Sequence, residues 1–274
     1  MRAELLHNFA KYSGAGNSFV IAACSEKNAT TGKLSQLAKK ICSRESGLGA
    51  DGFLVLIPTL NKDEFTWDFY NSDGSVAEMC GNAARCAALY ISNQQKSANK
   101  KIQFNTLAGT VRTELAAESL ITVEMTPLVG GDVEQLTIEG KEISFFRVNT
   151  GVPHVVIDLG AEFRPEPLKN MAAILRAHKH FGNAGTNVTL VQKIRTDEVK
   201  AVTYERGVED FTLACGTGAV AAAAFNKHSS GAMKTTVEMP GGTLIVEFGS
   251  ANEQPRMMGP AIEICKFEWK AQDE

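Results

Sequence analysis

Two cysteines of this chain have almost the same neighbours. Cys80 lies in the segment EMCGNAARCAALY and Cys215 lies in the segment LACGTGAVAAAAF. In both segments a glycine, a small polar residue and an alanine-rich run follow the cysteine, which predicts a helix that begins just after it. Because the positive end of a helix stabilises an anion, each thiol is placed where it ionises more easily than usual.

Two such thiols can perform proton chemistry that one thiol cannot. A helix N-terminus contributes about 0.3–1 kcal/mol to an anion, and up to about 2 kcal/mol when partly buried, which lowers the pKa of a thiol by about one unit. This modest shift suits a pair with one thiolate and one thiol, because coupling between neighbouring thiols resists ionising both. One sulfur can remove a proton from one face of a carbon while the other delivers a proton to the opposite face, so we expect racemisation or epimerisation.

The other four cysteines are expected to be small core residues, since free cysteine is among the most buried residue types. They are Cys24, Cys42, Cys86 and Cys265. Cys86 is six residues from Cys80 and falls on a different helix face, so the two are not expected to form a redox or metal pair.

The segments around the two cysteines are also repeated. YSGAGNSFVIA and VNTGVPHVVIDLG each combine a glycine loop with an apolar strand. Gly14 precedes Cys80 by 66 positions and Gly151 precedes Cys215 by 64. A second glycine turn follows each cysteine: Gly109 lies 29 positions after Cys80, and Gly242 lies 27 positions after Cys215. These matches indicate an internal duplication.

Each half also contains one further amphipathic stretch, GKLSQLAKKICSRE and PLKNMAAILRAHKHF, which predicts a second helix. The rest of each half is short strands. We therefore expect an α+β fold of two pseudo-symmetric domains, each a curved, mainly antiparallel sheet wrapped around a central helix. The expected domains are residues 1–126, with Cys80, and residues 127–262, with Cys215; a strand in 263–274 could return to the first domain.

Composition excludes several classes of protein. The 274 residues are 44% hydrophobic and 22% charged, and no apolar run approaches the roughly 20 residues of a membrane span. A net charge of −3 without long blocks of like charge does not predict a basic surface that would bind nucleic acid. The N-terminal stretch has no apolar signal core, so we expect a soluble, cytoplasmic protein whose six cysteines are reduced.

Seven segments together resemble one known family. They are GAGNSFV, GLGADG, YNSDGSVAEMCGNAARCAA, NTGVPHVV, GTNV, YERGVEDFTLACGTGA and PGGTL. In this order and spacing the sequence resembles the diaminopimelate epimerases, isomerases of lysine and peptidoglycan biosynthesis that use two cysteines and no cofactor. The resemblance covers nearly the whole chain. It implies a small-molecule amino-acid substrate, no bound metal, a homodimer, and two domains that close over the substrate.

The resemblance also implies roles for individual residues. Cys80 and Cys215 would be the acid/base pair, and His154 would assist near the reacting centre. Backbone amides would hold the carboxylate at that centre, those of Gly81, Asn82, Gly216 and Thr217. Other substrate contacts would come from Asn17, Asn71, Asn187, Glu205 and Arg206.

These residue types fit an amino-acid zwitterion, but each also has a purely structural interpretation. The planar guanidinium of Arg206 can bind a distal carboxylate, and Glu205 can accept from an ammonium group. Outside the motifs, the asparagines would be loop residues and the charged pair a surface ion pair. His154 could equally be structural. Asp51 and Asp73, each followed by glycine, are interpreted as turn residues, and His178 and His180 lack the cluster that a metal needs.

The sequence departs from the family pattern at three positions. Val152 stands where many members have an asparagine that contacts the distal end of the substrate, Ser18 replaces a usual aspartate, and Ala83 replaces a common glycine. One missing neutral hydrogen bond is worth about 1 kcal/mol. We therefore expect relaxed specificity toward other acidic amino acids, with the cysteine chemistry intact.

Three alternative functions are also compatible with the sequence. The chain could be a two-cysteine racemase of proline or hydroxyproline, although Arg206 argues for a substrate with a second carboxylate. It could bind an amino acid without catalysis, or use its cysteines as a redox pair. Exchange of the substrate's α-proton separates epimerisation from the last two, and a panel of amino acids separates it from the first.

Overall fold

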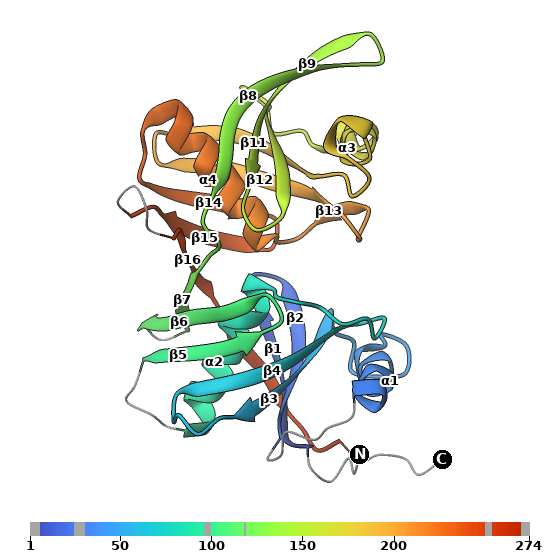
Figure 1. Cartoon of the computed structure of the whole chain (residues 1–274), viewed down its shortest axis with the longest axis vertical. Coiled ribbons are helices and arrows are strands. Elements are labelled where there is room, and N and C mark those ends of the chain that lie inside the picture. Colours follow the sequence, from blue (N-terminus) through green and yellow to red (C-terminus); the bar gives the residue numbers. More distant parts are fainter. Residues whose placement is uncertain (1–5, 25–30, 96–99, 118, 250–253, 270–274) are drawn as a thin grey trace. The chain divides into compact units, whose positions relative to one another are not determined.

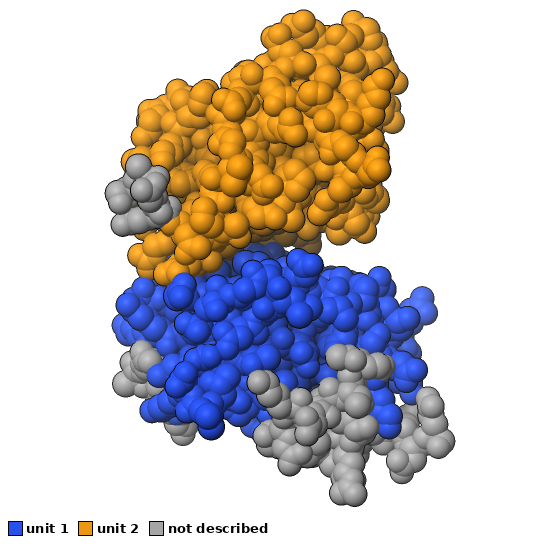
Figure 2. All heavy atoms as spheres, viewed as in Figure 1, with its two compact units in different colours: residues 1–123, 259–274 blue, residues 124–258 orange. Residues whose placement is uncertain are grey.

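The computed structural model describes residues 6–24, 31–95, 100–117, 119–249 and 254–269. The chain divides into two compact units, shown in Figure 2: unit 1 comprises residues 1–123 and 259–274, and unit 2 comprises residues 124–258. Residues 270–274 of the segment expected to return to the first domain lie outside the described residues. No helix of the described residues is long and apolar enough to span a membrane.

In unit 1 a sheet curves around helix α2, and helix α1 packs on the other face (Figure 1). The helices are α1 (Thr31–Cys42) and α2 (Gly81–Gln95). The strands are β1 (Leu6–Gly14), β2 (Asn17–Cys24), β3 (Gly52–Pro58), β4 (Glu64–Asn71), β5 (Lys101–Thr106), β6 (Gly109–Ala117), β7 (Leu120–Glu124, whose last residue belongs to unit 2) and β17 (Ile262–Lys266). Val20 and Ala22 of β2 share a buried cluster with Leu34 and Ile41 of α1. Alternate residues of a strand face opposite sides of the sheet. The residues of β2 next to Val20 and Ala22 therefore face α2.

Unit 2 repeats this arrangement around helix α4 (Figure 1). Its helices are α3 (Lys169–Arg176) and α4 (Gly216–Ser230), with 3₁₀ turns at Glu166–Leu168 and Lys179–Phe181. Its strands are β8 (Val129–Ile138), β9 (Lys141–Asn149), β10 (Pro153–Asp158), β11 (Asn187–Arg195), β12 (Glu198–Glu205), β13 (Asp210–Thr212), β14 (Lys234–Met239), β15 (Gly242–Glu247) and β16 (Arg256–Pro260, whose last two residues belong to unit 1).

The order of strand pairing is the same in both units. In unit 1 the pairs β1–β2, β3–β4, β5–β6 and β6–β7 are antiparallel, while β2–β3 and β4–β5 are parallel. The same succession recurs in unit 2 from β9 to β16, with β13 added beside β12. The expected α+β fold of two duplicated halves, with mainly antiparallel sheets, is confirmed.

Each unit also contains one strand that the chain supplies after finishing the other half. β8 follows β7 directly and pairs with β9, the first strand of the unit 2 repeat. β17 follows β16 and pairs antiparallel with β1, the first strand of the unit 1 repeat. Thus the strand that follows the first repeat, β8, pairs with the first strand of the second repeat, and the strand that follows the second repeat, β17, pairs with the first strand of the first repeat.

The expected burial of Cys265 is wrong, because this residue is exposed on β17. Side chains alternate along a strand, so Cys265 shares a face with Glu263. Glu263 takes hydrogen bonds from Tyr12 Oη and from Asn93 Nδ2 at 3.1 Å. These polar contacts occupy the face where an apolar core was expected.

The second predicted outer helix is also shorter than its sequence pattern. It ends at Arg176, and His178 has an extended backbone with φ −67° and ψ 136°. The His178 side chain accepts a hydrogen bond from the His180 backbone N–H, which begins a 3₁₀ turn instead of continuing the helix.

The central helices are buried on all sides over most of their length, except in their last turns. Every residue of α2 from Gly81 to Ile91 is buried, and in α4 the run from Gly218 to Ala224 is buried. The small side chains of these alanine-rich stretches let the strands approach the helix axis closely, which explains why a helix without a polar face is stable here.

Candidate active site

A tight hairpin places Asn17 beside the start of α2. Ala15 and Gly16 connect β1 to β2 with φ angles of 57° and 85°, and two positive φ angles are typical of a type I′ hairpin. Gly14, at the end of β1, lies against α2: a Cβ atom there would be 3.0 Å from the Asn82 backbone oxygen and 3.2 Å from Cys86 Sγ. Only glycine lets the hairpin approach the helix this closely.

Cys80 immediately precedes α2. Its backbone oxygen accepts the first hydrogen bond of the helix, from Ala84 N at 2.9 Å. The side chain is half-buried, and Sγ lies 3.9 Å from Asn17 Oδ1. The thiol is thus next to the first-turn N–H groups of α2, those of Gly81 and Asn82, which form an anion-binding end of the helix.

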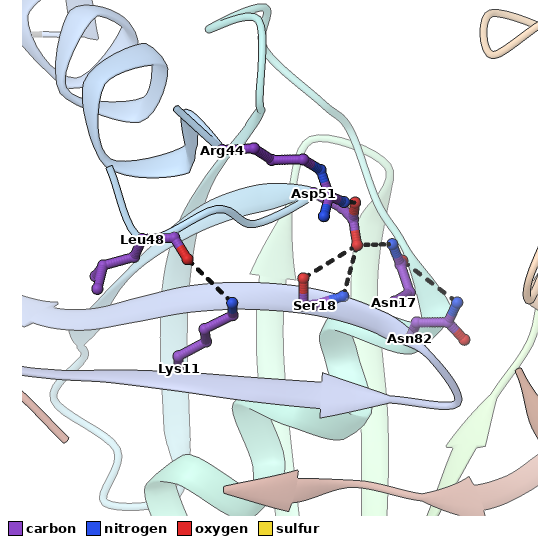
Figure 3. A network of polar contacts seen from close by, with 7 residues as sticks. All are labelled: Lys11, Asn17, Ser18, Arg44, Leu48, Asp51 and Asn82. Carbon is purple, nitrogen blue, oxygen red and sulfur yellow. Dashed lines mark hydrogen bonds and ion pairs between the residues drawn. The ribbon is translucent and has the colours of Figure 1, made fainter. Parts of the chain in front are cut away.

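Asn17 is held by a carboxylate on its other side. Its Nδ2 donates to Asp51 Oδ2 at 2.9 Å, and the same oxygen accepts from the Ser18 N–H at 2.7 Å and from Ser18 Oγ at 3.2 Å (Figure 3). Arg44 Nη2 lies 3.0 Å from Asp51 Oδ1. Asp51 therefore supports a predicted substrate contact, beyond the turn role that its sequence context suggested.

A buried arginine holds Asn82. Arg85 is fully buried, and its Nη2 donates to Asn82 Oδ1 at 2.8 Å while its Nε donates to the Pro260 carbonyl at 3.3 Å. Asn82 Nδ2 is 3.4 Å from Asn17 Oδ1. Burial lowers the pKa of Arg85, but a guanidinium stays charged at neutral pH, so it acts as a fixed donor.

Asn71 has different partners from Asn17 and Asn82. It is exposed at the end of β4, and its Nδ2 donates to Ser75 Oγ at 2.9 Å. The next residue, Ser72, donates its backbone N–H to the Asp51 carbonyl at 3.2 Å. The structure therefore places Asn71 immediately before the loop that leads to Cys80, with its side chain bonded to Ser75 of that loop.

Cys215 occupies the N-cap of α4 in the same way as Cys80 precedes α2. Its backbone oxygen accepts from Ala219 N at 2.9 Å, and its Sγ accepts from Gly218 N at 3.4 Å and lies 3.3 Å from Thr217 Oγ1. The residue is buried, with 4% of its surface exposed. The N–H group directed at the sulfur stabilises a thiolate.

His154 is fully buried at the centre of a polar network in unit 2. Its Nε2 lies 3.0 Å from Thr217 Oγ1 and 3.3 Å from Asn187 Nδ2, and its Nδ1 lies 3.1 Å from Thr189 Oγ1. Burial, with a smaller contribution from the charge of Arg206, lowers the pKa of His154 to about 3. The ring is therefore neutral at physiological pH.

The hydrogen bonds also assign the tautomer of this ring. The Arg206 backbone N–H donates to Asn187 Oδ1 at 2.8 Å, which turns the Asn187 NH₂ group toward His154 Nε2. Nε2 is then an acceptor, so the ring proton is on Nδ1 and is donated to Thr189. The hydroxyl of Thr217, within reach of both Nε2 and Cys215 Sγ, can donate to either.

Glu205 is the last residue of β12 and Arg206 follows it, next to this network. Burial raises the pKa of the Glu205 carboxyl group, while hydrogen bonds with Thr212 and Cys215 act in the opposite direction. The raised pKa means that a proton is held more tightly by this carboxyl group than by an ordinary glutamate. Its contact with Cys215 joins an acidic group to the thiol.

Apart from Asn71, whose side chain is engaged with Ser75, the predicted residues form two clusters, one in each unit. Asn17, Cys80 and Asn82 lie together in unit 1, and Gly81 follows Cys80. The cluster in unit 2 is larger; its members are His154, Asn187, Glu205, Arg206, Cys215, Gly216 and Thr217. Among the residues that the structure describes, no group of three or more His, Cys, Asp or Glu has the arrangement of a metal site.

The sequence of this chain matches that of a known protein family. The sequence model of the family described as "Diaminopimelate epimerase" matches residues 9–129 and 146–264, which include both cysteines and both clusters. The chain belongs to the diaminopimelate epimerase family.

Relatives that are named diaminopimelate epimerase are similar over most of their length. The protein of Aquifex aeolicus is 33% identical, with 97% of this chain and 98% of the relative covered. The protein of Carboxydothermus hydrogenoformans is 36% identical, with coverages of 95% and 98%, and that of Helicobacter pylori strain 26695 is 39% identical over 78% of each chain.

Solved structures with low sequence identity share the fold. A hydroxyproline epimerase from Agrobacterium vitis, with bound trans-4-hydroxy-L-proline, is 16% identical with a TM-score of 0.69, covering 97% of this chain and 93% of that chain. A putative phenazine biosynthesis protein from Clostridium difficile is 12% identical with a TM-score of 0.72, with coverages of 96% and 99%. These likenesses support the duplicated α+β fold.

Three contributors to the clusters of this diaminopimelate epimerase family member were missed in the sequence. Asp51 supports Asn17, Arg85 holds Asn82, and Thr189 accepts from His154. Asp51 and Arg85 do lie inside motifs that carry the family resemblance, GLGADG and CGNAARC, which is a signal that could have found them. Thr189 lies outside those motifs, on β11, and its position follows only from the pairing with β10.

Proposed function

We propose that this chain interconverts LL- and meso-2,6-diaminopimelate by a two-base mechanism, with Cys80 and Cys215 as the acid/base residues. The observation that carries the proposal is the repeated setting of the two cysteines. Each sits at the N-terminal end of a buried central helix, and each has a side-chain partner from a family motif, Asn17 in one unit and Thr217 in the other.

The reaction needs two groups that act on opposite faces of one α-carbon. A thiolate removes the α-proton, and a thiol delivers a proton to the other face; in the reverse direction the two sulfurs exchange roles. Both faces have then been used once, so the configuration at the carbon is inverted. The first-turn amides of Gly81, Asn82, Gly216 and Thr217 supply donors for the carboxylate at the reacting centre, where negative charge builds up.

The remaining polar residues suit the other groups of the substrate. Arg206 supplies a planar fork for the distal carboxylate, and Glu205 accepts from an ammonium group. Asn17, Asn71 and Asn187 can donate or accept. His154 is neutral, so in this proposal it holds the Thr217 hydroxyl near Cys215 and does not itself transfer the proton.

Two sulfurs supply both proton transfers, so we propose that no cofactor or metal ion takes part. The purified protein is expected to show no pyridoxal aldimine absorption and to keep its activity after exhaustive chelation. Loss of activity on chelation that a divalent metal restores would contradict this part of the proposal.

Val152 supports some breadth of specificity. It is half-buried before the start of β10, where a valine side chain offers no hydrogen bond to the distal end of a substrate. We propose that shorter acidic amino acids such as glutamate are accepted weakly alongside diaminopimelate.

We further propose a cytoplasmic homodimer that acts in lysine and peptidoglycan biosynthesis. All six cysteines are thiols rather than disulfide halves, which fits a reducing compartment. β17 exposes Ile262 and Ile264, at 55% and 51% of their surfaces, on a strand that a second copy could cover. Sedimentation of the purified chain, with Ile264→Lys as the variant expected to weaken association, tests the dimer.

The activity is tested by incubating the full chain with LL-diaminopimelate in D₂O. Proton NMR should show loss of the α-proton signal together with formation of the meso isomer. Proline, hydroxyproline and glutamate serve as competing substrates in parallel reactions. Efficient racemisation of proline with none of diaminopimelate, or binding of diaminopimelate without deuterium incorporation, would rule out the proposed reaction.

A further inference from the structure

In unit 1, four polar side chains form a row with a charged group at each end. Buried Arg85 lies at one end and Asp51 at the other, with Asn82 and Asn17 between them. An arginine only donates hydrogen bonds and a carboxylate only accepts them. The two ends therefore determine which atom of each amide faces which neighbour.

The direction of the row can be followed from either end. Arg85 Nη2 donates to Asn82 Oδ1 at 2.8 Å, which turns the Asn82 NH₂ group toward Asn17 Oδ1 at 3.4 Å. At the other end, Asp51 Oδ2 takes the Asn17 Nδ2 proton at 2.9 Å (Figure 3). Both neighbours thus impose the same orientation on the Asn17 amide.

This orientation decides what Cys80 encounters. The atom of Asn17 that lies 3.9 Å from Cys80 Sγ is the oxygen Oδ1, because Nδ2 is turned toward Asp51. An amide oxygen accepts from a thiol but gives nothing to a thiolate. If the amide were reversed, an N–H group would face the sulfur and would stabilise the thiolate instead.

We propose that Asp51 is a positioning residue for the acid/base chemistry of Cys80: it holds the Asn17 oxygen toward the sulfur and so favours the protonated thiol. The inference rests on the proposed function only in treating Cys80 as an acid/base residue. The same acceptor is available to a donor group of the substrate, such as an ammonium.

Two buried groups of α2 that interact electrostatically with Cys80 keep their charge state when its thiol titrates. They are Arg85 and Cys86. Burial raises the pKa of Cys86 to about 12, so this thiol stays neutral, and the guanidinium of Arg85 stays cationic. Asp51 and its partner Arg44 lie beyond Asn17.

Two substitutions of Asp51 separate orientation from charge. Three donors, Asn17 Nδ2, Ser18 N and Ser18 Oγ, converge on the single oxygen Oδ2. Asp51→Asn can keep an oxygen there and turn its NH₂ group toward Arg44, which is 75% exposed and can move into solvent. Asp51→Ala removes the oxygen. Both variants lose the same charge, and only the alanine variant removes the acceptor that holds the Asn17 NH₂ group.

The measurement is the rate of Cys80 alkylation by iodoacetamide as a function of pH, followed by mass spectrometry of the peptide that carries Cys80. The midpoint for Asp51→Ala is expected about one pH unit below that for Asp51→Asn, the effect of reversing one hydrogen bond. Equal midpoints for the two variants would overturn the proposal. No substrate is present, so the result stands whether or not the chain epimerises diaminopimelate.

A second measurement on the wild-type chain covers the case in which Asp51→Ala does not fold. With ¹⁵N-labelled asparagine, the Asn17 side-chain NH₂ signals are assigned by their loss in Asn17→Ala. They are expected to shift when acid is added, because Asn17 Nδ2 donates to the Asp51 carboxylate, while the signals of Asn61, which donates to Glu64, provide a comparison on another carboxylate. Asn17 signals that do not respond to acid titration would refute the orientation by Asp51.

Discussion

The sulfur atoms of the two cysteines differ in their surroundings. Cys80 is half-buried and faces the oxygen of Asn17, whereas Cys215 is buried and takes a hydrogen bond from Gly218 N. Serine at either position would have the right shape but an acid/base group whose pKa lies far above the working pH.

Single replacement of Cys80 or Cys215 by alanine is expected to abolish epimerisation. One positioned acid/base group is worth about 10²–10⁴-fold in rate, and each turnover needs two. The check is solvent deuterium incorporation at the α-carbon in D₂O, with Cys265→Ala, a thiol exposed on β17, as the matched control. Serine variants should still eliminate a β-leaving group from an analogue, because that step needs only proton removal. Near wild-type epimerisation by either alanine variant would disprove the two-thiol mechanism.

Val152→Asn is expected to sharpen discrimination for diaminopimelate over glutamate. The added amide can supply about 1 kcal/mol of hydrogen bonding to the distal end, or roughly a fivefold change in relative kcat/KM. Val152→Ala, which changes size without adding a donor, is the control. Unchanged relative kcat/KM in the asparagine variant would show that residue 152 does not read the distal end.

The buried His154 is expected to make stability depend on pH. Its pKa is about 3 in the folded chain and about 6.5 in the unfolded chain. Between these values the unfolded state binds the extra proton, so the free energy of unfolding falls as the pH drops from about 6.5, by at most about 1.4 kcal/mol per pH unit. Urea titrations at several pH values measure this slope.

In the same titrations, His154→Gln should reduce the slope, while replacement of the exposed His7 by glutamine provides a control. Glu205 changes the free energy of unfolding in the opposite direction. Its raised pKa means that, at pH values just above the usual pKa of glutamate, the folded state binds a proton more readily than the unfolded state. A slope that survives His154→Gln unchanged would assign the effect to other groups.

At the level of the elements, the contact between α4 and β12 controls the position of Cys215. A Cβ atom at Gly218 would lie only 2.1 Å from Thr203 Oγ1. Gly218→Ala is therefore expected to push the first turn of α4 away from β12 and to cost about 1–3 kcal/mol of stability. The displaced turn also carries the N–H group that faces Cys215 Sγ, so kcat should fall as well.

The second substitution Thr203→Ala removes the atom that the new methyl group meets. The double variant is expected to regain most of the stability lost by Gly218→Ala, measured by urea unfolding, relative to Thr203→Ala alone. If adding Thr203→Ala does not restore stability to the Gly218→Ala variant, the steric contact is not the cause of its lost stability.

The sequence predicted the local settings better than the contacts between strands. Both cysteine helices follow from an alanine-rich run and a glycine, which are local signals. Asp51 became a partner of Ser18 only because β2 and β3 pair in parallel with Phe19 opposite Gly52, a register that no local pattern contains. The strand-like segment after 262 was visible, but its exposure was not, because an alternating pattern predicts which residues share a face and leaves open what covers that face.

For the molecule as a whole, β17 is expected to determine the stability of unit 1. It pairs with β1, and its Glu263 accepts from Tyr12 and from Asn93 of α2. Burial raises the pKa of Tyr12 above its usual value, so the phenol stays a donor over the whole working range of pH. Without β17 this buried hydroxyl would lose its acceptor.

In a chain truncated after Pro260, the backbone amides of unit 1 are therefore expected to lose protection while those of unit 2 keep it. Hydrogen exchange should show lost protection in β1 and β2, while β10, β11 and β12 of unit 2 keep theirs. The full-length variant Glu263→Gln, which keeps the strand and one acceptor, is the control. Equal loss of protection in both units would mean that they unfold together.

The pairing of β8 with β9 and of β17 with β1 also determines the order in which the two units can be completed during synthesis on the ribosome. Unit 2 is one continuous stretch, 124–258, so all of its strands are available once that stretch has emerged. Most of unit 1 is translated before unit 2, but β1 can pair with β17 only after residues 259–274, which follow unit 2, have also emerged. The half of the protein that is made first is thus finished last, and a nascent chain halted before Ile262 carries an uncovered strand edge that can pair with another chain.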